Sequence, residues 1–143
     1  MKKLILLLVL ATAFLSCSKS DDNKELPVTY GNISGVWYLS QYIKMDGTVV
    51  NHVHKCATLK DNMNFVVNIL NIDVKKYYAN CVSVDDSDSS FNFYLENNII
   101  KNGNSFIDNC TIVSLTKDKM VLNYSEPHIM INQYYKTMIV TRN

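Results

Sequence analysis

Residues 62–69 read Asn-Met-Asn-Phe-Val-Val-Asn-Ile, and this stretch decides the fold class. Its odd-numbered positions are all apolar, and three of its four even-numbered positions are asparagine. Apolar residues at every second position indicate a β-strand with one buried face. The stretch therefore predicts one half-buried strand over 62–69.

The same alternation recurs on both sides of this stretch. Strands are expected near residues 37–43, 49–54, 74–84, 91–96, 99–100, 110–115, 120–125 and 134–142. Asp46-Gly47 and Asn102-Gly103 are typical hairpin turns, because these residue types accept a positive φ, and 117–119 supplies another turn. The pattern predicts an all-β fold, either an up-and-down antiparallel barrel of about eight strands or a sandwich.

Composition limits the domain count and the function classes. The chain has 143 residues, 48% of them hydrophobic, with 14 basic and 13 acidic side chains and a net charge of +1. Such a length holds one domain, and the balanced charge argues against a nucleic-acid partner. The sequence patterns typical of serine hydrolases, papain-like proteases and phosphate-binding loops do not occur. We therefore predict neither an enzyme nor a bound cofactor.

The N-terminus has the features of a targeting segment. Lys2 and Lys3 precede an apolar run of twelve residues, Leu4–Leu15. As a helix this run would reach about 18 Å, short of the ~30 Å hydrocarbon core of a bilayer. We therefore predict a cleaved signal peptide over 1–16 instead of a membrane-spanning anchor.

The end of this segment resembles the lipobox of bacterial lipoproteins, with Phe-Leu-Ser-Cys at 14–17. The resemblance implies cleavage before Cys17 and attachment of fatty-acid chains such as palmitate, which anchor a protein durably when several are present. The polar segment that follows resembles the surface-export signal of lipoproteins in one phylum of Gram-negative bacteria: Lys19, Ser20, Asp21 and Asp22. We expect residues 17–29 to be a tether from the outer membrane, with display on the cell surface preferred over the periplasmic face.

Gly35-Val36-Trp37 resembles the G-x-W opening of lipocalin-type barrels, and Ile112–Leu122 is similar to paired strands of bacterial lipocalin-like lipoproteins. The resemblance covers about 33–142. It implies a monomeric lipocalin-like barrel over 30–143, in which Gly35 and Trp37 close the base at the first strand. It also implies that Arg142, the only arginine of the chain, lies over the Trp37 ring.

The chain has four cysteines, of which three remain once Cys17 carries lipid. An odd count leaves one pair and one free thiol, or an intermolecular bridge. The family resemblance implies a disulfide between Cys56 and Cys81, which leaves Cys110 free.

Three side chains share one face of an extended segment at 52–56, namely His52, His54 and Cys56, and His128 is a candidate fourth ligand. Imidazole and thiolate bind soft divalent metals. Because a cysteine of an exported protein more often forms a disulfide, we predict a solvated strand end and no metal, and keep His52, His54 and His128 as the alternative.

The inward face of the predicted barrel carries no charge, and this suggests a function. We expect a small apolar or amphipathic ligand inside the barrel. The alternative is a surface module or inhibitor that acts through its loops on a protein, glycan or host factor. The predicted cavity residues are Leu39, Gln41, Phe65, Val67, Phe93, Leu95, Leu122 and Met138.

Overall fold

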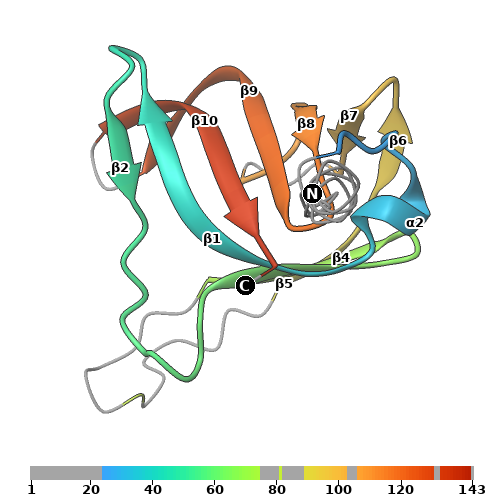
Figure 1. Cartoon of the computed structure of the whole chain (residues 1–143), viewed down its shortest axis with the longest axis horizontal. Helices are drawn as coiled ribbons and strands as arrows, with labels where there is room; N and C mark the ends of the chain where they lie inside the picture. Colours follow the sequence, from blue (N-terminus) through green and yellow to red (C-terminus); the bar gives the residue numbers. More distant parts are fainter. Residues whose placement is uncertain (1–23, 75–80, 82–88, 103–105, 131–132, 143) are drawn as a thin grey trace, which may run out of the picture.

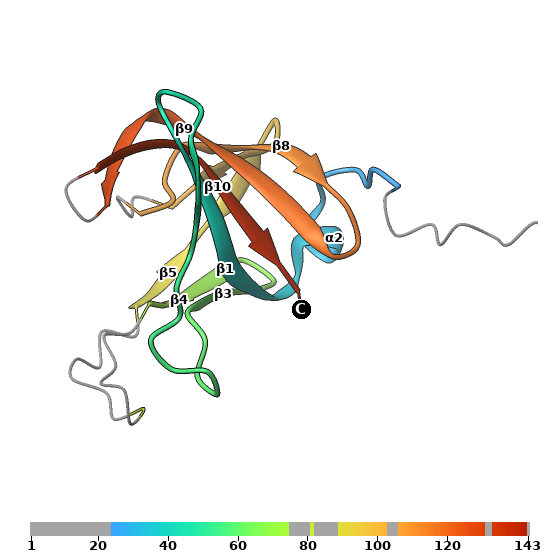
Figure 2. The same cartoon turned by 60° about the vertical axis from the view of Figure 1, so that its left-hand side comes forward.

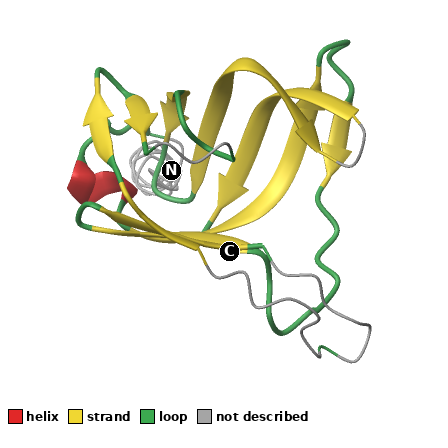
Figure 3. Cartoon of the chain, turned by 180° about the vertical axis from the view of Figure 1, so that it is seen from behind, coloured by secondary structure: helices red, strands yellow, loops and turns green. Residues whose placement is uncertain are grey.

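The described strands pair with one another to form one curved sheet. The computed structural model describes residues 24–74, 81, 89–102, 106–130 and 133–142. One helical turn, α2 (Tyr30–Ile33), comes before the strands and is the helix that Figure 3 shows in red. The strands are β1 (Gly35–Lys44), β2 (Val49–Asn51), β3 (Asn62–Val66), β4 (Ile69–Asp73), β5 (Ser89–Asn92), β6 (Tyr94–Glu96), β7 (Ile99–Lys101), β8 (Cys110–Leu115), β9 (Lys119–Met130) and β10 (Gln133–Thr141).

The sheet is antiparallel throughout and runs in the order β5-β4-β3-β1-β10-β9-β8-β7-β6, with β2 paired to β1 outside this path. The first strand therefore pairs with the last. β5 and β6 form the two ends of the order, but they are consecutive in the chain, so the sheet curls into a nearly closed barrel (Figures 1 and 2). The prediction of an all-β barrel is confirmed.

The stretch 62–69 forms a hairpin and not the single strand that its alternation predicted. Val66 pairs with Ile69, and Val67 and Asn68 form the two-residue turn between β3 and β4. Val67 has a φ of 54°, a conformation that β-branched residues rarely adopt. The prediction of Val67 as an inward residue is wrong, because the turn leaves its side chain 72% exposed.

The predicted strand at 91–96 is also divided in two. The chain turns at Phe93, so that β5 pairs with β4 while β6 pairs with β7. The Phe93 side chain stays buried, and its backbone N–H donates to the carbonyl of Asn68 in the turn between β3 and β4, next to the pairing of Ile69 with Asn92. Each of these two divisions turns one predicted strand into two, so the described residues hold ten strands where a barrel of about eight was predicted.

A β-bulge in β1 changes which side chains point into the barrel. Leu39 pairs with Val140 and Gln41 with Ile139, so Ser40 is an extra residue. The extra residue reverses the alternation, as bulges do, and Tyr42 becomes buried in place of Gln41. Gln41 was predicted to line the cavity, and this is wrong: its side-chain amide donates to Asn51 on the neighbouring strand at 2.9 Å.

The turns agree with the sequence in part. Gly47 has a φ of 89° in the turn between β1 and β2, as Asp46-Gly47 predicted. Asn102-Gly103 does not join two strands as a tight hairpin, because β8 starts only at Cys110, and Gly103 lies outside the described residues. The tight turn is instead at Asn97 and Asn98, both with positive φ, between β6 and β7.

The core fills the barrel, and the segment before α2 packs against it. Large side chains with less than 2% exposure come from most strands and include Trp37, Phe65, Leu70, Ile100 and Leu122. Leu26 packs on this core, and its N–H donates to the carbonyl of Leu115, so the packed domain begins earlier than the predicted residue 30. Among the described residues, no helix is long and apolar enough to cross a membrane. Most of the strand predicted at 74–84 lies outside the described residues.

Candidate functional site

The start of β1 and the end of β10 form a sealed end of the barrel, which we call the Trp37 end. The Trp37 indole N–H donates to the carbonyl of Ile33 at 2.7 Å, and the ring has no exposed surface. The Arg142 guanidinium lies 4.2 Å from the ring centroid of Trp37, as the family resemblance implied. Arg142 also donates to the carbonyls of Asn32 and Ser34, each at 2.9 Å.

The two hydrogen bonds from Arg142 go to backbone carbonyls at the C-terminal end of α2. The last carbonyls of a helical turn have no partner inside it and carry a partial negative charge. Arg142 therefore satisfies carbonyls at the end of α2 while its charge faces the Trp37 ring. Thr29 fixes the other end of α2, since its hydroxyl accepts the N–H of Asn32. The Trp37 end is a structural closure.

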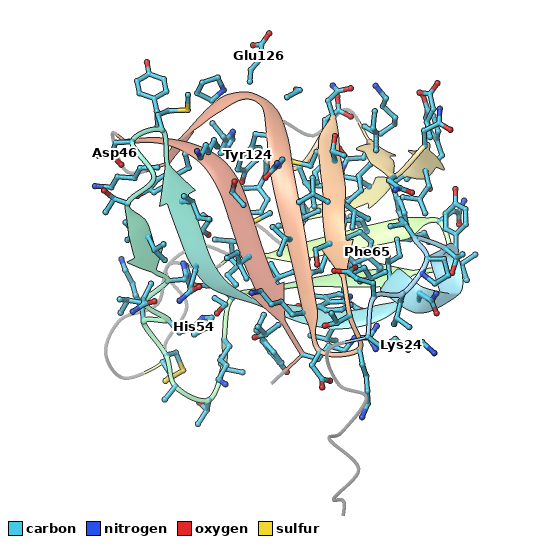
Figure 4. All side chains as sticks on the ribbon, turned by 45° about the horizontal axis from the view of Figure 1, so that its top comes forward. Lys24, Asp46, His54, Phe65, Tyr124 and Glu126 are labelled. Carbon is cyan, nitrogen blue, oxygen red and sulfur yellow. A yellow bond between two sulfur atoms is a disulfide. The ribbon has the colours of Figure 1, made fainter. Side chains whose placement is uncertain are left out.

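The predicted cavity residues mostly form the packed core. Leu39, Phe65, Leu122 and Met138 are at most 1% exposed, and the Phe65 ring meets Phe93 edge-on at 5.3 Å. Figure 4 shows Phe65 among the side chains enclosed by the sheet. Leu95 is half-buried and packs against the same core.

A hollow of about 320 Å³ lies beyond this core, where β1 and β10 approach the β2 loop. We call it the Tyr42 hollow. It is partly enclosed and its walls are mainly apolar. None of the predicted cavity residues lines it. The lining residues are Tyr42, Val50, Asn51, His52, Val53, Lys55 and Tyr135.

Two tyrosines form the floor of this hollow. The Tyr42 and Tyr135 rings lie 5.2 Å apart, and both side chains are buried, at 4% and 5% exposure. The Tyr42 hydroxyl has no hydrogen-bond partner among the described residues. Burial, and secondarily the nearby Asp61 carboxylate, raises the pKa of Tyr42, so the group remains a neutral phenol. A buried hydroxyl without a partner costs about 1–3 kcal/mol.

Three ionisable side chains meet beside the Tyr42 hollow, and we call them the His52 cluster: His52, His54 and Asp61. Asp61 Oδ2 lies 2.6 Å from His52 Nε2 and 3.7 Å from His54 Nδ1, and the Asp61 side chain is 7% exposed. The Asp61 backbone N–H donates to His54 Nδ1 at 3.1 Å. Burial, together with the adjacent His52, lowers the pKa of His54.

The position of this cluster follows from the pairing of β1. The first half of β1 pairs with β3, and its second half pairs with β2 on the same edge. The segment that joins β2 to β3 therefore departs from this edge near Ser40 and comes back to it at the same point. The His52 N–H donates to the Ser40 carbonyl, and the Leu39 N–H donates to the Asp61 carbonyl. Sequence analysis missed Asp61. The one sequence feature that pointed to Asp61 is its position directly before β3, the strand that pairs with β1 next to His52.

The same loop carries the disulfide. Cys56 and Cys81 are bonded, as the resemblance implied, and Cys110 is a free, buried thiol. Burial raises the pKa of the Cys110 thiol to about 12, so it stays protonated. Because Cys56 is in the disulfide, it offers no thiolate that could bind a metal together with the neighbouring histidines.

His128 does not join the other two histidines in the His52 cluster. Its ring stacks on Tyr124 at 4.9 Å and meets Phe106 edge-on. Figure 4 shows Tyr124 on the upper part of the barrel and His54 on the loop below, on a different part of the molecule. The alternative ligand set that included His128 is thus not assembled.

A second hollow, of about 580 Å³, lies at the seam between the two ends of the sheet. We call it the seam hollow. Its lining is rich in amide and charged groups, with Phe93 and the 59% exposed Tyr94 as its aromatic members.

Several predicted site residues cannot be placed. Cys17, Lys19, Ser20, Asp21 and Asp22 lie outside the described residues, as does the signal peptide. Comparisons with protein-family models, with curated proteins and with solved structures find no match for the chain.

Proposed function

We propose that the protein is a lipid-anchored outer-membrane lipoprotein, displayed at the cell surface, that binds one small amphipathic molecule in the Tyr42 hollow. The lipobox-like residues 14–17 and the acidic pair after Cys17 support the address. The hollow supports the binding function, and its size is at the lower end of the range of small-molecule sites.

The observation that carries the binding proposal is the Tyr42 hydroxyl. It is buried, neutral and without a partner among the described residues, and it belongs to the lining of a hollow. The hydroxyl oxygen itself is buried, so a ligand in the hollow pairs with it, and removes the cost of leaving it unpaired, only when the side chains that cover it move aside. Proteins bind small molecules in such sites, where apolar walls surround a few polar groups.

The lining also defines the chemistry of the ligand. Val50, Val53 and the two tyrosine rings contact an apolar body, and Tyr42 contacts one polar group. Lys55 is exposed at the edge, where its ammonium group suits an anionic end of the ligand. The proposed site is therefore at the end of the barrel and not among the packed residues of its interior.

The seam hollow favours a second candidate function, a surface module for a polar partner such as a glycan. Tyr94 offers an exposed ring for stacking, and Asn68, Asn92 and Lys101 offer hydrogen-bonding groups beside it. This function needs no ligand in the Tyr42 hollow.

Titration with the anionic, apolar dye anilinonaphthalene sulfonate tests the binding proposal. We expect one dye per chain. Val50→Trp fills the hollow and should abolish binding, and Tyr42→Phe should weaken it about fivefold, the effect of one hydrogen bond of ~1 kcal/mol. Tyr134→Phe is the matched control, because Tyr134 is 56% exposed and outside the hollow. Equal binding by all four proteins would reject the Tyr42 hollow and favour the surface module.

Metabolic labelling with a fatty-acid analogue tests the anchor. Wild-type protein should be labelled and Cys17→Ala should not. Replacing Asp21 and Asp22 by alanine should keep the label but lower the fraction that an external protease reaches on intact cells. Labelling of the Cys17→Ala variant contradicts the proposed anchor.

A further inference from the structure

We infer that His52, His54 and Asp61 form a binding site for one divalent transition-metal ion, with Zn²⁺ as the best-fitting ion. One ligand atom from each residue lies within 4.8 Å of the others. Two imidazoles and a carboxylate are suitable ligands for Zn²⁺, Cu²⁺ or Ni²⁺, whereas Ca²⁺ and Mg²⁺ prefer oxygen ligands alone.

The separations between these atoms suit an ion held between them. Bonds of about 2.0–2.1 Å in a tetrahedral site place neighbouring ligand atoms roughly 3.3 Å apart. The separations of 2.6 Å and 3.7 Å from Asp61 Oδ2 to the two histidines lie on either side of this value. The three ligand atoms lie within 4.8 Å of one another, so the side chains must rotate toward a common centre to hold the ion. The ion then replaces the contact between His52 and Asp61 and the hydrogen bond accepted by His54 Nδ1.

The backbone around the three ligands is fixed, which lowers the cost of assembling the site. Hydrogen bonds to Ser40 and Leu39 hold the chain at His52 and at Asp61. Between them, the buried Cys56 sulfur accepts the Leu59 N–H and is bonded to Cys81. A loop closed at both ends and joined to a second segment keeps its side chains close to the geometry that binding needs.

The electrostatics also favour a cation. Asp61 brings a carboxylate with 7% side-chain exposure next to both imidazoles, and this set of ligands attracts a divalent cation. The two histidines are 14% and 20% exposed, so solvent and a metal ion reach the cluster from outside. Three protein ligands leave a fourth position for water or for a donor atom from a molecule in the adjacent Tyr42 hollow.

Metal titration of the full chain tests this inference without any organic ligand, so its failure is distinct from failure of dye binding. The protein carries no polyhistidine tag and is first treated with EDTA. Calorimetry with Zn²⁺ alone should show one ion per chain. With Co²⁺ alone, the intense visible absorption of a tetrahedral complex should appear and should disappear when Zn²⁺ is added.

Variants identify the ligands. His52→Gln and His54→Gln should each weaken Zn²⁺ binding by more than the roughly 10–100-fold that residues behind the ligands contribute. His128→Gln is the matched control, because His128 is half-buried but outside the cluster, and it should bind Zn²⁺ as the wild type does. Asp61→Asn is read by the Co²⁺ spectrum, and circular dichroism of each variant confirms that it is folded.

Two results would overturn the inference. One is the absence of Zn²⁺ binding and of a Co²⁺ spectrum in folded wild-type protein. The other is loss of binding in His128→Gln equal to the loss in the His52 and His54 variants, which indicates non-specific capture by surface histidines.

Discussion

The two ends of β1 differ in how their polar groups are satisfied. At the Trp37 end, the indole N–H has a carbonyl partner, and the Arg142 guanidinium donates to two further carbonyls and contacts the ring. Arg142 Nε is buried without a partner among the described residues, but it belongs to a guanidinium that already makes these two hydrogen bonds in a packed region. At the other end, five residues along the strand and past the bulge at Ser40, the Tyr42 hydroxyl is buried without a partner among the described residues. Both aromatic side chains are buried to a similar degree, so burial alone does not distinguish them.

The difference indicates that one end of β1 stabilises the fold and suggests that the other end binds a ligand. Satisfied polar groups in a filled region stabilise a fold, whereas an unsatisfied group beside a hollow is tolerated where a ligand completes it. We therefore assign stability to the Trp37 end, and propose that binding takes place at the Tyr42 hollow and the His52 cluster. The following substitutions test this division.

Trp37→Ala should have the largest effect. It removes a fully buried aromatic side chain, its hydrogen bond and the surface on which Arg142 rests, and should lower the free energy of unfolding by about 3–5 kcal/mol. Urea denaturation measures this value. A loss below that of Tyr42→Phe, described below, contradicts the division between the two ends.

Loss of the disulfide should come next. Replacing Cys56 and Cys81 by alanine opens a link between residues 25 apart and should destabilise the chain by about 3–4 kcal/mol. Because the link fixes the loop of the His52 cluster, Zn²⁺ binding should weaken as well. Wild-type protein reduced with dithiothreitol is the matched comparison. An unfolding curve identical to that of oxidised wild type would show that the bond carries no stability.

Arg142 substitutions should have a moderate and graded effect. Arg142→Ala loses two hydrogen bonds and the cation–π contact and should cost about 1–3 kcal/mol. Arg142→Lys keeps the charge but cannot reach both carbonyls with the same geometry, so its cost should be smaller. Thermal unfolding of both variants checks the order. Equal and negligible losses argue against the contact.

Tyr42→Phe should have the smallest effect on stability, with the opposite sign to the other variants. Removing a buried hydroxyl that has no partner should leave the free energy of unfolding unchanged or raise it by up to ~1 kcal/mol. The measurement is urea denaturation of ligand-free protein. A loss of stability instead would show that the hydroxyl has a structural partner.

Local pattern predicted the elements whose side chains alternate without interruption. The boundaries expected for 110–115 are those of β8, and the last strand is within one residue of its expected bounds. The contact between Trp37 and Arg142 came from a family resemblance. Each of these features depends on a local period or on a motif that the sequence shows directly.

The remaining features depend on long-range geometry. The turn at Val67 places a β-branched residue at positive φ, against its own preference, because β3 and β4 both pair within the closed sheet. The Ser40 bulge, which buries Tyr42 in place of Gln41, has no marker in the residues around it. Asp61 meets His52 only because two separate strands share one edge of β1. The candidate site was therefore less predictable than the fold.

Native mass spectrometry of the protein purified from its own host tests the central claim most directly. We predict that wild-type protein retains one small-molecule mass per chain. Val50→Trp, which fills the Tyr42 hollow, should lose that mass, and Tyr134→Phe should keep it. A wild-type spectrum that shows only the protein chain, or a retained mass that Val50→Trp keeps, contradicts the proposed binding in the Tyr42 hollow.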